Sequence, residues 1–182
     1  LDRRIRVALP VYGCGFLYEH GGLAKDISSL RDAQRRLWIE LLDPARYLKK
    51  SRIPMLFING SSDVVFPLEC WQKSYLQVQN HTACVKVDMQ HSHVDGWAPV
   101  EIALFVDHHL RGGLGLPSLG ALRLKGKTAE APFSSPVAIS RAELACSADT
   151  GSWNERKWQL KEATLDGSLI RAELPDARPI MF

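Results

Sequence analysis

The chain has 182 residues, 46% of them apolar, and a formal net charge of +3 at pH 7. This apolar fraction is enough to build the core of one domain or of two small ones. Because the basic residues form no long run and no apolar stretch approaches the length of a membrane span, we expect neither a nucleic-acid nor a membrane partner. The cysteines lack the paired spacing of metal or redox sites and are predicted to be buried free thiols: Cys14, Cys70, Cys84 and Cys146.

The first third of the chain is predicted to hold a strand over residues 5–12 and a helix over residues 30–41. The helix follows from apolar residues on one face, and Asp43-Pro44 ends it. No capping or targeting feature precedes the strand, and a further strand-like run ends the chain at residues 180–182. We therefore expect a fragment cut at both ends.

Residues 53–59 form an almost unbroken apolar run, which predicts a central parallel strand covered on both faces. Asp63 falls in the loop just beyond the carboxyl end of this strand, where open α/β sheets place their chemistry. A helix is expected to begin at Pro67 because apolar residues then repeat at helical spacing, namely Leu68, Trp71, Tyr75 and Val78.

A second strand is predicted over residues 83–89, and it leads into a loop that contains His91 and His93. The next helix is expected to begin near Pro99 and to end at Gly112-Gly113. The order is therefore strand, aspartate loop, helix, strand, histidine loop, helix.

The composition changes after Gly113. Residues 114–118 are predicted to be a linker, and residues 119–182 contain strand-like segments separated by turn signals. We expect this part to be an incomplete antiparallel β-sandwich domain of immunoglobulin-like type. Trp153 and Trp158 either fill its core or offer rings on which sugars stack.

Four short motifs occur along the chain: PVYGCG at residues 10–15, DPARYL at 43–48, NGSSD at 59–63 and MQHSH at 89–93. Together they resemble the α/β-hydrolases, and within them the bacterial acetyl-xylan-esterase-like and prolyl-oligopeptidase-like hydrolases, including the PhoPQ-activated pathogenicity-related type. The resemblance implies that residues 1–113 are the C-terminal half of an α/β-hydrolase parallel sheet with flanking helices. It also suggests a periplasmic or secreted protein.

In that family a serine is activated by a histidine, and an aspartate orients the histidine. By resemblance Asp63 is the orienting carboxylate; the alternative is a turn aspartate that caps the next helix. Asp88 is a rival carboxylate, although it is predicted to lie inside a strand. Tyr12 either touches the substrate or packs in the core.

The base is either His91 or His93, and we favour His93 because it lies a few residues beyond the strand, directly after the small Ser92. A His-x-His pair also binds zinc in some proteins, with Asp63 or Asp95 as a third ligand. We predict no cofactor and keep a metal-dependent hydrolase as an alternative.

No Gly-x-Ser-x-Gly motif occurs in the sequence. We therefore expect the nucleophilic serine to lie upstream of this chain and the chain alone to be inactive. The predicted function is that of a serine hydrolase that cleaves carboxylic esters, with acylated carbohydrates as candidate substrates. The alternative is a non-catalytic scaffold that binds a glycan or a protein.

The strands at residues 7–12 and 55–59 should be poorly buried unless the N-terminal half or an oligomer covers the sheet.

Overall fold

The structure is a computed structural model that describes residue 2 and residues 4–176, so the strand expected at residues 180–182 lies outside the described residues. The elements, in chain order, are α1 (Ala24–Ser29), α2 (Asp32–Leu41), α3 (Ala45–Leu48), β1 (Met55–Gly60), α4 (Leu68–Tyr75), β2 (His81–Lys86), α5 (His93–Trp97), α6 (Glu101–Arg111), β3 (Ser118–Leu119), β4 (Arg123–Lys125), β5 (Thr128–Ser134), β6 (Ala142–Cys146), the 3-10 helix η1 (Trp153–Glu155), β7 (Gln159–Asp166) and β8 (Leu169–Glu173). None of the helices in this part of the chain is long and apolar enough to cross a membrane.

β1 is the centre of the first layer and is buried along its whole length. β2 pairs with β1 in parallel, from Met55 opposite His81 to Gly60 opposite Lys86. On the other side of β1, Ala8 and Val11 form isolated parallel bridges. The apolar run is therefore a parallel strand covered on both faces, as its composition predicts. The expectation that the strand at residues 55–59 would be poorly buried in this chain is wrong.

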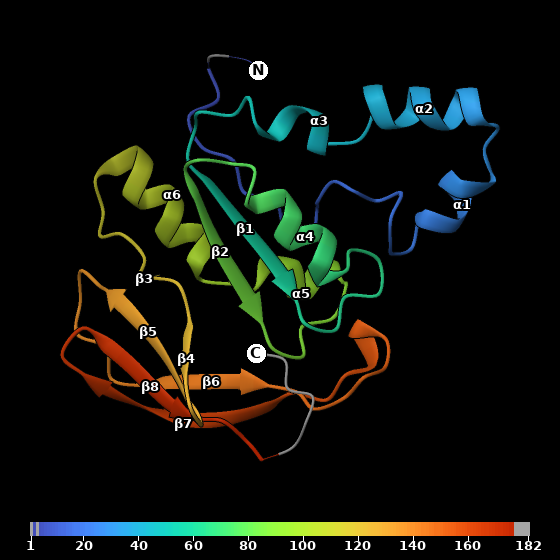
Figure 1. Cartoon of the computed structure of the whole chain (residues 1–182). Helices are drawn as coiled ribbons and strands as arrows, with labels where there is room; N and C mark the ends of the chain where they lie inside the picture. The colour runs from blue at the N-terminus through green and yellow to red at the C-terminus, as the bar shows by residue number, and fades with distance from the viewer. Residues whose placement is uncertain (1, 3, 177–182) are drawn as a thin grey trace.

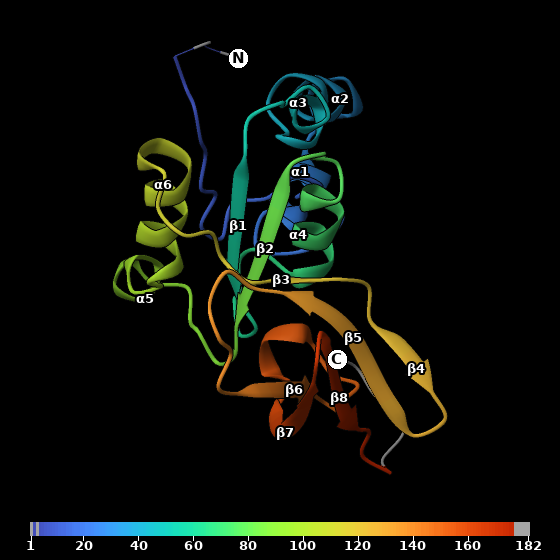
Figure 2. The same ribbon diagram turned by 90° about the vertical axis from the view of Figure 1, so that its left-hand side faces the viewer.

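Side chains of β1 alternate between two cores, as the pleat of a strand requires. Met55 and Phe57 pack against α4 and the N-terminal helices, where Trp71 is the largest buried side chain. Leu56 and Ile58 pack on the opposite face, against Phe105 of α6. Figure 2 shows the same division, with α5 and α6 on one side of the two strands and α4 on the other.

The predicted α/β-hydrolase sheet is wrong. The parallel sheet of the described residues contains only β1 and β2. Residues 8–11 lie beside β1 but do not complete a strand, because Pro10 has no N–H to donate and Tyr12 turns the backbone into the left-handed region with a φ of 63°. What the structure shows is a small parallel pair with flanking helices.

The second layer is a curled antiparallel sheet that forms a half-barrel, and it lies beyond the ends toward which β1 and β2 point (Figure 1). The strand order is β3-β5-β8-β7-β6, with β4 also paired to β5. The predicted two-sheet sandwich of immunoglobulin type is wrong, because β7 pairs with β6 through its first half and with β8 through its end. β7 thus joins β6 and β8 in a single sheet. The boundaries proposed for the two domains and the linker stay a prediction.

Contacts between the two layers involve α4 and η1. The indole N–H of Trp153 donates to a carboxylate oxygen of Glu69. Around this bond lies a cavity of about 300 Å³, lined by aromatic side chains that include Trp71, Tyr75 and Trp158. Trp153 and Trp158 are both half-buried, so they pack at the junction of the layers.

Candidate active site

The structure brings Asp63 and His91 together at the carboxyl ends of β1 and β2. His91 Nδ1 lies 3.0 Å from Asp63 Oδ2. The side chain of Asp63 is 1% exposed and that of His91 is 34% exposed. The carboxylate of Asp63 is thus buried, whereas the imidazole of His91 is partly exposed to solvent.

Asp63 uses its two oxygens for different tasks. Oδ1 accepts hydrogen bonds from the backbone N–H groups of Val65 at 2.7 Å and Phe66 at 2.9 Å, which closes the turn after β1. Oδ2 is left for His91. Asp63 thus closes the turn and contacts His91 with the same side chain, but it does not cap α4, which begins without a side-chain cap.

The proton between the two side chains belongs on Nδ1, because an ionised carboxylate only accepts hydrogen bonds. Nε2 of His91 then carries the free lone pair, which is the state a general base needs. The ring is held between Tyr12, whose ring centroid is 4.5 Å away, and Phe66 at 5.6 Å. These contacts fix the direction in which Nε2 points.

Tyr12 also holds the histidine loop. Its hydroxyl lies 2.8 Å from the carbonyl oxygen of Gln90 and 3.0 Å from that of Ser92, so its single proton serves one carbonyl at a time. The hydroxyl accepts from the backbone N–H of Ser92 at 3.3 Å. Burial raises the pKa of Tyr12, which keeps the phenol neutral and able to donate.

Two glycines let these segments approach one another. A Cβ on Gly60 would lie 2.0 Å from the carbonyl oxygen of Met89, where the chain leaves β2. A Cβ on Gly96 would lie 2.9 Å from the ring of Tyr12. Any larger residue would push the aspartate turn away from the histidine loop, or α5 away from Tyr12.

His93, the histidine favoured from the sequence, does not bond to Asp63. It is the first residue of α5, and Ser92 caps that helix by accepting the backbone N–H of Asp95 at 3.0 Å. Because His93 lies in the first turn of α5 and His91 lies in the loop before it, the histidine that contacts Asp63 is His91 and not the favoured His93. The spacing of Ser92 and Asp95 is that of a capping box, which is the sequence signal that identifies this helix start.

The other carboxylates near the loop have different partners. Asp88 is exposed, lies in the turn after β2 and donates its backbone N–H to Ser61 Oγ at 2.8 Å. Asp95 accepts a hydrogen bond from Ser92 Oγ at 2.8 Å. Throughout the part of the chain that the structure describes, no group of three or more histidine, cysteine, aspartate or glutamate side chains is arranged to hold a metal ion.

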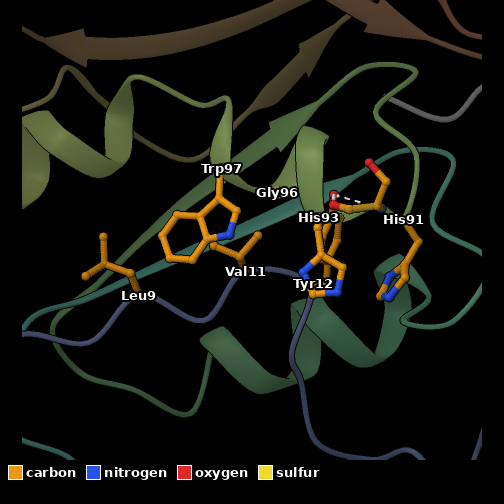
Figure 3. A pocket seen from close by; sticks show the side chains of 8 residues that line it. Leu9, Val11, Tyr12, His91, His93, Gly96 and Trp97 are labelled. Atoms are coloured by element: carbon orange, nitrogen blue, oxygen red, sulfur yellow. Dashed lines mark hydrogen bonds between the residues drawn. The ribbon is translucent and has the colours of Figure 1, made fainter.

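A cavity of about 430 Å³ opens beside the two histidines (Figure 3). Leu9, Val11 and Trp97 line one end, and Tyr12 and the histidines line the other. The described residues that line it are mostly apolar and include no lysine, arginine or carboxylate. It therefore suits an uncharged group.

Within the described residues, no hydroxyl or thiol forms a hydrogen bond with His91 Nε2. Ser61 and Ser92 are engaged elsewhere, with Asp88 and Asp95. Burial raises the pKa of the Cys70 thiol to about 11 and raises that of Cys14 still further, so both are inert as nucleophiles at neutral pH. Among the described residues, the site therefore holds a hydrogen-bonded pair of Asp63 and His91 with no hydroxyl or thiol bonded to the imidazole.

Neither a protein-family model nor a curated protein sequence matches the chain. The resemblance to the α/β-hydrolases rests on the four short motifs. It stays a prediction.

Proposed function

We propose that this chain contributes the general-base half of a Ser-His-Asp hydrolase that cleaves carboxylic esters. His91 is the base, Asp63 orients it, and Tyr12 positions the loop that carries it. The observation that carries the proposal is the 3.0 Å contact between Asp63 Oδ2 and His91 Nδ1, made by a carboxylate that is 1% exposed.

The proposal does not depend on the α/β-hydrolase sheet. The same three side chains recur on unrelated folds and are recognised by their geometry and roles. Asp63 and His91 meet the requirement for a base oriented by a carboxylate. The proposal takes the nucleophilic hydroxyl and the oxyanion-stabilising groups from other polypeptide, because the nearby hydroxyls of Ser61 and Ser92 bond to Asp88 and Asp95 rather than to His91.

The tautomer of His91 tests the orienting role directly. In the 15N-labelled chain at about pH 8, where an ordinary imidazole is neutral, long-range 1H–15N spectra should show His91 protonated on Nδ1. Asp63→Asn should shift the proton toward Nε2, because the amide can turn its NH2 group toward the ring. His93→Ala is the matched control and should leave the His91 spectrum unchanged. A wild-type His91 protonated on Nε2 would refute the assignment.

Hydrolysis tests the base itself. The chain alone should give no burst of p-nitrophenol from p-nitrophenyl acetate. In a longer form that contains the nucleophile, Asp63→Asn should lower kcat/KM by roughly 10⁴-fold and His91→Ala by a similar factor. His93→Ala should change it by less than about tenfold. Loss of activity in His93→Ala with full activity in His91→Ala would overturn the assignment.

A further inference from the structure

The cavity of about 300 Å³ between the two layers has no role in the proposed hydrolysis. Trp71 and Tyr75 line it from α4 of the parallel layer, and Trp153 and Trp158 line it from the second layer (Figure 1). Among the described residues, no side chain lines both this cavity and the one beside His91. The two cavities are therefore separate sites.

Two indole groups at this junction cavity lack an acceptor. Trp71 is 3% exposed and Trp158 is half-buried. In the part of the chain that the structure describes, neither indole nitrogen has a hydrogen-bond partner, although both atoms are buried. Trp153, by contrast, donates its indole N–H to Glu69. A buried donor without an acceptor is destabilising, so an occupant that brings acceptor atoms to Trp71 and Trp158 would stabilise the cavity.

The charges around the junction cavity favour an uncharged occupant. Glu69 lines the cavity, and its carboxylate repels an anion. The guanidinium of Arg156 lies 4.4 Å from the centroid of the Trp153 ring, where it repels a second cation approaching that ring. A neutral occupant meets neither repulsion.

The aromatic rings restrict the shape of the occupant. Trp71 and Tyr75 meet edge to face, with their ring centroids 4.8 Å apart and an interplanar angle of 71°. They thus present surfaces at a steep angle, whereas a flat heteroaromatic ring stacks best in a parallel slot. A sugar ring suits angled walls, because its C–H groups pack on aromatic faces while the hydroxyls at its rim both donate and accept hydrogen bonds. The small volume suits one ring rather than a chain of them.

We propose that the junction cavity binds one neutral pyranose sugar ring. Hydroxyl oxygens of the sugar accept the indole N–H groups of Trp71 and Trp158. A further hydroxyl donates to Glu69, whose carboxylate has acceptor positions beyond the one that Trp153 uses. A single ring makes few contacts, so we expect a dissociation constant of about 1–10 mM. Binding requires neither Asp63 nor His91, so it does not depend on the proposed ester hydrolysis.

The test follows the five tryptophan indole N–H signals of the 15N-labelled chain during titration with glycosides. The probes are methyl β-glucoside, methyl β-galactoside and methyl N-acetyl-β-glucosaminide, each up to about 50 mM. At least one should move the Trp71 and Trp158 signals downfield and to saturation, as hydrogen bonds form. Trp97, which lines the cavity beside His91, and Trp38 on α2 should not respond. A response of Trp97 alone would put the sugar in the other cavity and overturn the proposal.

Trp158→Phe keeps an aromatic face and removes one indole donor. It should raise the dissociation constant of the glycoside about threefold to tenfold. Trp97→Phe, at a residue that is 77% exposed, is the matched control and should leave the dissociation constant unchanged. The dispersion of the backbone amide signals shows whether each variant is folded. Equal affinities of the wild-type and folded Trp158→Phe chains would refute the role of this donor and the proposal with it.

Glycerol, tetramethylammonium and caffeine test the chemistry of the occupant. They represent a polyol without a ring, a cation and a flat heteroaromatic ring. At the same concentration, each should shift the Trp71 and Trp158 signals less than the glycoside does. Stronger binding of any of the three would overturn the proposal, and so would the absence of a response to every glycoside at about 50 mM.

Discussion

At the scale of single residues, the site depends on two side chains, those of Asp63 and Tyr12, that each contact two parts of the structure. Asp63 bonds the turn with one oxygen and His91 with the other. Tyr12 bonds the histidine loop through its hydroxyl and contacts His91 with its ring. Motif spacing identified Asp63 and left two histidines open, and it gave Tyr12 no role in the loop. The role of Tyr12 depends on a contact across 78 residues of sequence, which no local pattern contains.

Tyr12→Phe should therefore loosen the loop without removing the ring. We expect it to lower the free energy of unfolding by about 1 kcal/mol, because a part-buried hydrogen bond is lost and the carbonyls of Gln90 and Ser92 lose the one donor they share. Tyr47→Phe is the control, because Tyr47 Oη also donates to a carbonyl, that of Leu41, but is exposed. Urea denaturation at neutral pH measures both, and equal losses in the two variants would contradict the role given to Tyr12.

The raised pKa of Tyr12 adds a pH dependence to this prediction. Folding favours the neutral phenol, so this contribution to stability is complete below about pH 10, the value for an unfolded tyrosine, and is lost as the pH rises through the higher folded value. The wild-type chain should lose more stability than Tyr12→Phe between about pH 9 and about pH 11. Parallel alkaline losses in both chains would show that Tyr12 does not titrate in this way.

At the scale of elements, the start of α5 decides which histidine faces Asp63. Ser92 caps the helix, so His91 stays in the loop and His93 enters the first turn. α2 shows what apolar spacing does not predict. Its apolar spacing correctly predicts a helix, yet Leu37 and Leu41 are each 56% exposed and only Trp38 packs against the core. Periodicity identifies a helix without saying what will cover its apolar face.

Ser92→Ala should remove the cap of α5. We expect a loss of about 1 kcal/mol in the free energy of unfolding and faster amide exchange in residues 93–97. Ser29→Ala is the control, because the Ser29 hydroxyl only donates to the carbonyl of Asp26 on the surface of α1. Unchanged exchange in α5 of the Ser92→Ala chain would show that the hydroxyl does not hold the helix start.

At the scale of the whole molecule, the parallel layer and the antiparallel half-barrel are joined through α4 and η1. The bond from Trp153 to Glu69 is charge-assisted and partly buried. It is therefore stronger than a bond between neutral groups. The layers should unfold together as long as this junction holds.

Glu69→Ala should weaken the junction, because the indole N–H of Trp153 then loses its acceptor. We expect a loss of about 1–2 kcal/mol and a broader denaturation transition as the layers uncouple. Glu40→Ala, at an exposed position of α2, should have little effect. Thermal unfolding followed by tryptophan fluorescence and by far-UV circular dichroism tests this. Midpoints that still coincide and do not shift in Glu69→Ala would contradict it.

Local pattern was sufficient for features that depend on neighbouring residues: the buried strand at β1, the helix after Pro67, the end of α6 at Gly112, and the loops that hold Asp63 and His91. Tertiary structure decided the rest. It placed His91 rather than His93 beside Asp63 through a helix cap, and among the described residues it limited the parallel sheet to β1 and β2. It curled the C-terminal strands into one sheet. The physical reason is that strand pairing is made by backbone groups far apart in the chain, and every residue except proline carries the same donor and acceptor.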